Sequence, residues 1–205
     1  MKTHKPKRRF GVILVIIGVI CLAAAVFLIV YNIVNGLRAE SFSRTVVSEI
    51  EEYIAENETE QQNETAPTKT EQNKVSDQIF EGYSYIGYLT IPDLSLKLPV
   101  MSDWSYEGLN LSPCRYSGSV ETNDLVIAAH NYDSHFGRIS ELSNGAQVLF
   151  TDLNGSTERY EVVSVDTLNP VEIEKMTSGD YDLSLFTCTP SGMARVTVRC
   201  DKLKN

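Results

Sequence analysis

The sequence predicts an all-β domain with short helices, preceded by one membrane-spanning helix and a flexible linker. Three observations support this fold class: a long uncharged apolar run near the N-terminus, a polar segment after it, and short β-prone stretches from residue 79 to 205. Each stretch is bounded by Gly, Pro, Asn, Asp or Ser. Strands this short and closely spaced favour a closed or nearly closed barrel over a sheet with crossover helices.

The N-terminal segment is typical of an uncleaved membrane anchor. Five Lys/Arg occur within MKTHKPKRR (1–9), and residues 10–34 carry no charge. As a helix this run can cross a hydrocarbon core of about 30 Å, and it is too long for the apolar part of a cleaved signal. Basic residues before the span and acidic ones after it predict a cytoplasmic tip (1–9), a single-pass anchor in the cell membrane (10–34) and an extracellular domain.

Residues 35–78 should connect the anchor to the domain. SFSRTVVSEIEEYIAE (41–56) has its apolar residues on one helical face. This helix could pack on the domain, lie along the membrane or form part of a stalk. Residues 57–78 have almost no large apolar side chain, which predicts a disordered acidic linker.

The charge balance argues against a nucleic-acid partner. The formal net charge is −9, and without the basic tip 13 Lys/Arg remain against 27 Asp/Glu. Nucleic-acid binding depends on neutralising phosphates with basic residues, and this surface has the opposite sign.

The predicted strands and helical turns follow alternation and turn residues. Strands are expected over residues 85–91, 95–100, 125–130, 146–151, 159–168, 183–188 and 194–200, with helical turns over 105–109 and 136–142. Of the four cysteines, Cys21 lies within the span, and a Cys114–Cys200 disulfide remains open. The spacing of Cys and His predicts no zinc site, and we expect no metal or cofactor.

Candidate catalytic residues stand at strand ends. Cys188 ends one strand, the turn Pro190–Gly192 follows, and Arg195 and Arg199 share a face of the return strand. His130 ends the apolar strand LVIAA. A cysteine nucleophile needs an imidazole for proton transfer, and a guanidinium can stabilise an oxyanion. Alternatively, the cysteine and histidine are structural and the domain is a non-catalytic, membrane-tethered binding module.

Three stretches carry a family resemblance. LTIPDLSLKLPV (89–100), LVIAAHNYDSHFGRISEL (125–142) and LSLFTCTPSGMARVTVR (183–199) resemble the sortases, the membrane-anchored cysteine transpeptidases of Gram-positive surfaces. The resemblance implies an eight-stranded β-barrel with Cys188 as nucleophile, His130 as general acid/base and Arg195 as the oxyanion or substrate-binding arginine. Arg195 is preferred over Arg199 because it is the first arginine after the turn.

The resemblance also implies a reaction. A C-terminal sorting signal of LPXTG type would be cleaved through a thioacyl enzyme and joined to an amine, such as a peptidoglycan cross-bridge, a lipid II group or a pilin lysine. A papain-like protease would have Cys before His, and an L,D-transpeptidase would have SxGC, so neither fits. The short segment 169–182 and the lack of a lid or second span argue against class B and the pilin-polymerising class. We expect Trp104 to pack. Glu172 and Glu174 resemble the calcium-binding acids of some class A members, but we expect them to be solvated loop charges.

Overall fold

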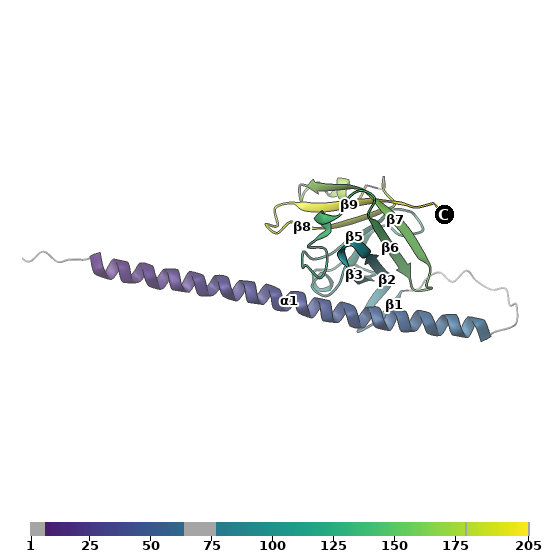
Figure 1. The fold of residues 1–205 in the computed structure, drawn as a ribbon, viewed down its shortest axis with the longest axis horizontal. Helices are drawn as coiled ribbons and strands as arrows, with labels where there is room; N and C mark the ends of the chain where they lie inside the picture. Colours follow the sequence, from purple (N-terminus) through teal and green to yellow (C-terminus); the bar gives the residue numbers. More distant parts are fainter. Residues whose placement is uncertain (1–6, 64–76, 179, 205) are drawn as a thin grey trace, which may run out of the picture. The chain divides into compact units, whose positions relative to one another are not determined.

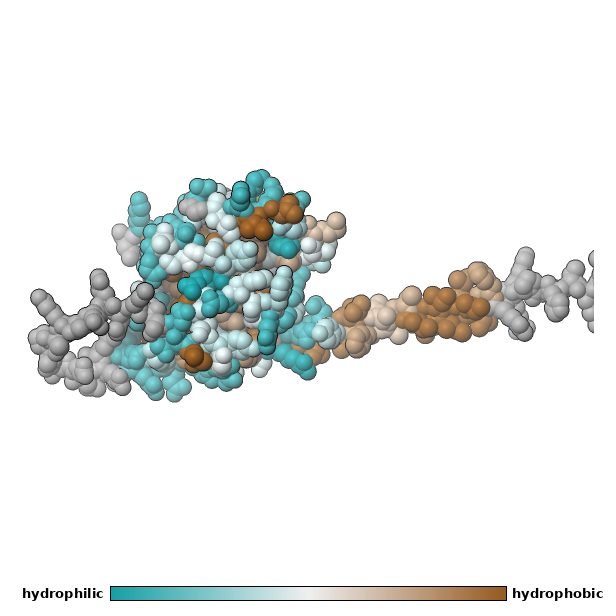
Figure 2. All heavy atoms as spheres, turned by 180° about the vertical axis from the view of Figure 1, so that it is seen from behind, coloured by the Kyte–Doolittle hydropathy of each residue, from teal (hydrophilic) through white to brown (hydrophobic). Residues whose placement is uncertain are grey.

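The computed structural model describes residues 7–63, 77–178 and 180–204, and the chain divides into one unit up to Leu37 and a second from Arg38 (Figure 1). Helix α1 (Lys7–Asn63) begins in the first unit. Among the described residues it is the one helix long and apolar enough to cross a membrane. Figure 2 shows its continuous hydrophobic surface over the predicted anchor.

Helix α1 joins two elements that the sequence treats separately. The anchor and the amphipathic helix form one uninterrupted helix, which continues to Asn63. Residues 57–63 are therefore helical where the sequence predicts a disordered linker. The rest of that predicted linker, residues 64–76, lies outside the described residues. No helix-breaking Pro or Gly separates residues 37 and 63, so the helical hydrogen bonds can continue.

The strands of the second unit form a closed barrel. Within the described residues, eight strands close through the pairing of β2 with β6, and β1 adds a short hairpin outside the ring. This confirms the predicted barrel. Following the ring, the order is β2-β3-β4-β5-β8-β9-β7-β6. The strands are β1 (Gln78–Phe80), β2 (Tyr83–Ile91), β3 (Leu96–Met101), β4 (Cys114–Ser117), β5 (Leu125–Ala128), β6 (Gln147–Asp152), β7 (Thr157–Leu168), β8 (Leu183–Cys188) and β9 (Arg195–Lys202).

Short helical turns fill the connections. They are η1 (Pro92–Leu94), α2 (Tyr106–Leu109), η2 (Ile139–Glu141) and α3 (Ile173–Met176). The Ser105 hydroxyl accepts a hydrogen bond from the Gly108 amide at 2.8 Å and so caps α2. Among its described residues, the segment between β7 and β8 holds one helical turn, α3.

Alternating apolar side chains from every ring strand except β4, together with residues of the connections, fill the barrel. Fully buried examples include Leu89, Ile127, Leu185 and Val198. Burying such side chains contributes roughly 1.5–3 kcal/mol each before entropy is counted. The barrel interior is thus the main stabilising core, and it fixes which residues of β5, β8 and β9 face outward.

A second apolar cluster joins α1 to the outside of the barrel. Val46 and Ile50 of α1 are fully buried beside Tyr85 and Met101 of β2 and β3. The apolar face of residues 41–56 therefore packs on the domain, which decides between the alternatives that the sequence left open.

The cysteines are unpaired. All four lie within the described residues and are free thiols. Cys200 belongs to the barrel core, whereas Cys114 belongs to the cluster beneath α1. The Cys114–Cys200 disulfide that the sequence allowed is therefore absent, because the two thiols are buried in different clusters.

Candidate active site

The three predicted catalytic residues lie at the ends of three neighbouring strands, with His130 two residues beyond its strand. β5 and β8 run parallel, with Ala128 beside Phe186, and His130 and Cys188 each follow two residues later. Since side chains alternate along a strand, His130 and Cys188 project from the same face. Arg195, at the start of β9, pairs directly with Cys188. All three side chains are partly exposed, as solvent-accessible chemistry requires.

The β8–β9 turn fixes the position of the Arg195 side chain. The Thr189 amide donates to the Ala194 carbonyl at 2.9 Å, and the Ala194 amide donates to the Thr189 hydroxyl at 3.2 Å. Gly192 has φ of 71°, a conformation that glycine adopts without strain. The Arg195 guanidinium donates to the carbonyls of Gly192 (3.3 Å) and Ala194 (3.1 Å), so the turn itself holds it.

Side-chain contacts also join the end of β8 to the segment that follows β5. The Thr187 hydroxyl donates to the Ala129 carbonyl at 2.8 Å. The Asn131 amide group donates to the Thr189 carbonyl at 3.5 Å. These contacts lie on either side of Cys188 and His130, so they fix the two strand ends relative to each other.

Asn131 contacts one nitrogen of the His130 ring, Nδ1. Its backbone amide donates to His130 Nδ1 at 3.1 Å, and its Oδ1 lies 3.1 Å from the same nitrogen. Among the described residues no hydrogen bond engages Nε2. The arrangement thus leaves Nε2 as the ring nitrogen for proton exchange with a bound molecule.

Two further side chains of the following loop surround His130. The Tyr132 ring is parallel to the imidazole, with centroids 4.2 Å apart and planes 3° apart. His135 is fully buried, and its ring lies 5.7 Å from that of Tyr132. Burial, and secondarily the charge of His130, lowers the pKa of His135 to about 4, so its imidazole is neutral at physiological pH.

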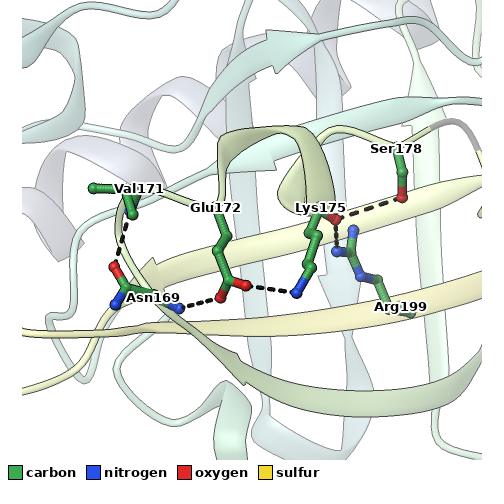
Figure 3. Close-up of polar contacts among 6 residues, drawn as sticks. All are labelled: Asn169, Val171, Glu172, Lys175, Ser178 and Arg199. Atoms are coloured by element: carbon green, nitrogen blue, oxygen red, sulfur yellow. Dashed lines mark hydrogen bonds and ion pairs between the residues drawn. The ribbon is translucent and has the colours of Figure 1, made fainter.

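Arg199 has a different environment from Arg195, although both are on β9. It is buried and pairs with Ser184, four residues before Cys188. Its guanidinium donates to the Ser184 hydroxyl at 2.8 Å, to the Met176 carbonyl at 3.0 Å and to the Lys175 carbonyl. Desolvation lowers the pKa of this guanidinium. Arg199 thus anchors the segment between β7 and β8 (Figure 3).

Two opposite charges of that segment, Glu172 and Lys175, pair with each other. Glu172 accepts from the Asn169 amide at 2.9 Å and forms an ion pair with Lys175 at 2.5 Å (Figure 3). Its hydrogen bond to Lys175 lowers the pKa of the exposed Glu172 carboxyl. In the part of the chain that the structure describes, no group of three or more His, Cys, Asp or Glu could hold a metal ion.

An aromatic row, which sequence reasoning did not assemble, lies beside the nucleophile strand. Phe186 contacts Tyr116 of β4 edge-on at 5.2 Å, and Trp104 contacts both Tyr116 (6.0 Å) and Tyr106 (4.7 Å). Trp104 packs as expected but stays 37% exposed. Phe186 shares a face with Cys188, so the row supplies an apolar surface next to the thiol.

The cysteines differ in burial. Cys188 is partly exposed. Burial raises the pKa of Cys114 to about 11 and that of Cys200 to about 12. Thiolates are the reactive form, so these two core thiols are inert at neutral pH.

Comparisons with known proteins agree with this fold. The family model for the sortase domain matches residues 89–203. The chain is similar to sortase C1 of Streptococcus suis, with 25% identity, a TM-score of 0.50 and coverage of 59% of this chain and 74% of that one. No curated protein matches the sequence.

Two solved structures from Clostridium perfringens share the fold at lower identity. Its sortase D5 transpeptidase is 16% identical, with a TM-score of 0.59 and coverage of 80% of this chain and 99% of that one. Its sortase C, solved with a C-terminal cell wall sorting motif, is 22% identical, with a TM-score of 0.53 and coverage of 78% and 91%.

Proposed function

Because this chain belongs to the sortase family of cysteine transpeptidases, we propose that it cleaves a C-terminal LPXTG-like sorting signal and joins the surface protein to an amine. The observation that carries this proposal is the direct pairing of Cys188 with Arg195, one strand away from His130. A partly exposed thiol, a guanidinium and an imidazole at one barrel end are what acyl transfer needs.

The reaction would proceed in two halves. Cys188 Sγ, its proton transferred to His130, attacks the carbonyl carbon of the signal's threonine, and the Arg195 guanidinium stabilises the resulting oxyanion. The C–N bond then breaks, His130 gives a proton to the leaving amine, and a thioacyl enzyme remains. In the second half an acceptor amine attacks the thioester, its proton passes to His130, and the C–S bond breaks.

The acceptor we propose is a peptidoglycan cross-bridge or precursor amine. In this proposal α1 is a single-pass anchor with a cytoplasmic N-terminus, and the barrel is extracellular. The five basic residues of the tip support this orientation. The apolar row of Phe186, Tyr116 and Trp104 suits the uncharged residues that precede the cleaved bond in such a signal.

Trapping the covalent intermediate tests this function. The detergent-solubilised full chain is incubated with LPXTG-type peptides, and the thioacyl adduct is located by mass spectrometry. We expect an adduct on Cys188, and neither an adduct nor cleavage in Cys188→Ala. His130→Ala should fold but lose cleavage. The matched control is Cys21→Ala, which removes a thiol in the apolar helix and should leave cleavage intact.

Thiol labelling separates this function from a non-catalytic binding module. A charged alkylating reagent should modify Cys188 in the folded protein and spare Cys114 and Cys200. Full peptide cleavage by Cys188→Ala would overturn the proposed chemistry.

A further inference from the structure

Tyr132 forms the most regular ring contact near the candidate active site. Its ring and the His130 imidazole are parallel within 3°, with centroids 4.2 Å apart. Tyr132 is only 7% exposed, so the ring is confined by its surroundings. A confined ring with one face on the imidazole limits the rotation of that imidazole about its side-chain bonds.

Backbone hydrogen bonds within the same loop fix the position of Tyr132. The Tyr132 carbonyl accepts hydrogen bonds from the amides of His135 and Gly137, both at 2.9 Å, and the Phe136 amide donates to the His130 carbonyl at 3.1 Å. A Cβ at Gly137 would lie 2.7 Å from the Asn131 carbonyl oxygen and 2.8 Å from that of Tyr132. The loop therefore closes tightly only because residue 137 is glycine.

Helix α1 supports this loop through a buried contact. The Ser43 hydroxyl donates to the Leu111 carbonyl at 3.3 Å, and Ser43 Oγ lies 3.5 Å from His135 Nε2. Because the hydroxyl donates to Leu111, its oxygen can accept a hydrogen bond from His135 when Nε2 carries the proton. Ser43 is 2% exposed and His135 fully buried, so the support is enclosed.

From these contacts we infer that Tyr132 is a positioning residue for His130, held in place by His135 and by Ser43 of α1. The inference rests on the proposed function, in which His130 transfers the proton. The stack acts on one face of the imidazole, while Asn131 contacts Nδ1. Together they keep Nε2 directed at the substrate in both halves of the reaction. Loss of the stack should therefore affect the proton-transfer steps more than peptide binding.

The test uses the full chain and two substitutions at one position. Tyr132→Leu removes the ring, and Tyr132→Phe keeps it. We expect Tyr132→Leu to lower kcat on the order of tenfold with KM nearly unchanged, since small misplacements of a catalytic group are costly. Tyr132→Phe should recover most of that loss. Unchanged kcat in Tyr132→Leu would overturn the inference.

A spectroscopic readout separates positioning from general structural support. The chain has only three histidines, so the imidazole protons can be followed by NMR after selective labelling, with His130→Gln giving the assignment. Protons over an aromatic face are shielded. The His130 ring protons should thus resonate upfield in the wild type and Tyr132→Phe, and downfield of that position in Tyr132→Leu.

Failure of the Tyr132 positioning role and failure of the proposed function are distinguished by separate measurements. If Tyr132→Leu does not fold, comparing the native and denatured wild type still reports the shielding. If the His130 ring protons are not shielded in the native protein, the imidazole does not stack on Tyr132 and the inference is wrong. A wild-type chain that leaves every sorting-signal peptide uncut would instead overturn the proposed function.

Discussion

Cys188 and Arg195 are direct partners across the β8–β9 ladder, joined by a turn that also binds the arginine's guanidinium. Arg199, which the sequence places on the same face, pairs instead with Ser184 and is buried. The two arginines of β9 therefore lie in different environments. Substitution of Arg195 should lower activity, whereas substitution of Arg199 should lower stability.

We expect Arg195→Ala to reduce kcat/KM on the order of a hundredfold, because an oxyanion donor is lost. The melting temperature should change little, since among the described residues the guanidinium of this partly exposed side chain donates hydrogen bonds within its own turn. Steady-state cleavage of a sorting-signal peptide and thermal unfolding provide the measurement. Arg195→Lys, which keeps the charge but loses the planar fork, should retain intermediate activity. Wild-type activity in Arg195→Ala would refute this role.

Arg199→Ala should instead destabilise the protein, by about 3 kcal/mol, because a buried charged donor to two carbonyls and a hydroxyl is removed. The segment between β7 and β8 loses its anchor, so limited proteolysis should cut within residues 169–182 faster than in the wild type. The control is Arg159→Ala at an exposed position of β7. Equal unfolding free energies for the two variants would contradict the assignment.

Ile50→Ala tests whether α1 is part of the folded domain. The side chain is fully buried against the barrel, and large-to-small changes of this kind cost about 2–5 kcal/mol. Chemical denaturation of the solubilised chain measures the loss. Glu52→Ala, at an exposed position of the same helix, should be close to neutral. If the two variants have the same free energy of unfolding, the helix does not contribute to domain stability.

His135 should make stability depend on pH. Its folded pKa, lowered by burial to about 4, lies below the unfolded value of about 6.5. The unfolded state then binds more protons, so stability falls as pH falls through this window. The loss is about 2 kcal/mol between pH 7 and pH 5. In His135→Gln this contribution should vanish, which denaturant titrations at the two pH values would reveal. An identical pH dependence in both proteins would exclude His135 as the cause.

Much of the barrel could be predicted because alternation and turn residues are local signals. The predicted strand 183–188 coincides with β8, and most other strands differ only at their ends. β4 was missed because it is a four-residue strand interrupted by a bulge between Arg115 and Ser117. The one-turn helix α3 was also missed, since its position depends on Arg199 at a distance.

The candidate site was only partly visible in the sequence. Cys188, His130 and Arg195 stand out because reactive residue types occur at strand ends, although their catalytic roles stay predictions. The supporting residues were not visible, because their contacts join distant parts of the chain. Ser43 and His135 are 92 residues apart, and Asn131 and Thr189 are 58 apart. No local pattern signals such pairs.

The insertion of β8 between β5 and β9 also constrains the order of folding. Strands β5 and β8 are adjacent in the ring, yet β6 and β7 lie between them in sequence. Closing such a non-local parallel pair is entropically slow, so the two strands should meet late. If the chain has the proposed function, a newly synthesised copy would therefore remain inactive until its last hairpin docks.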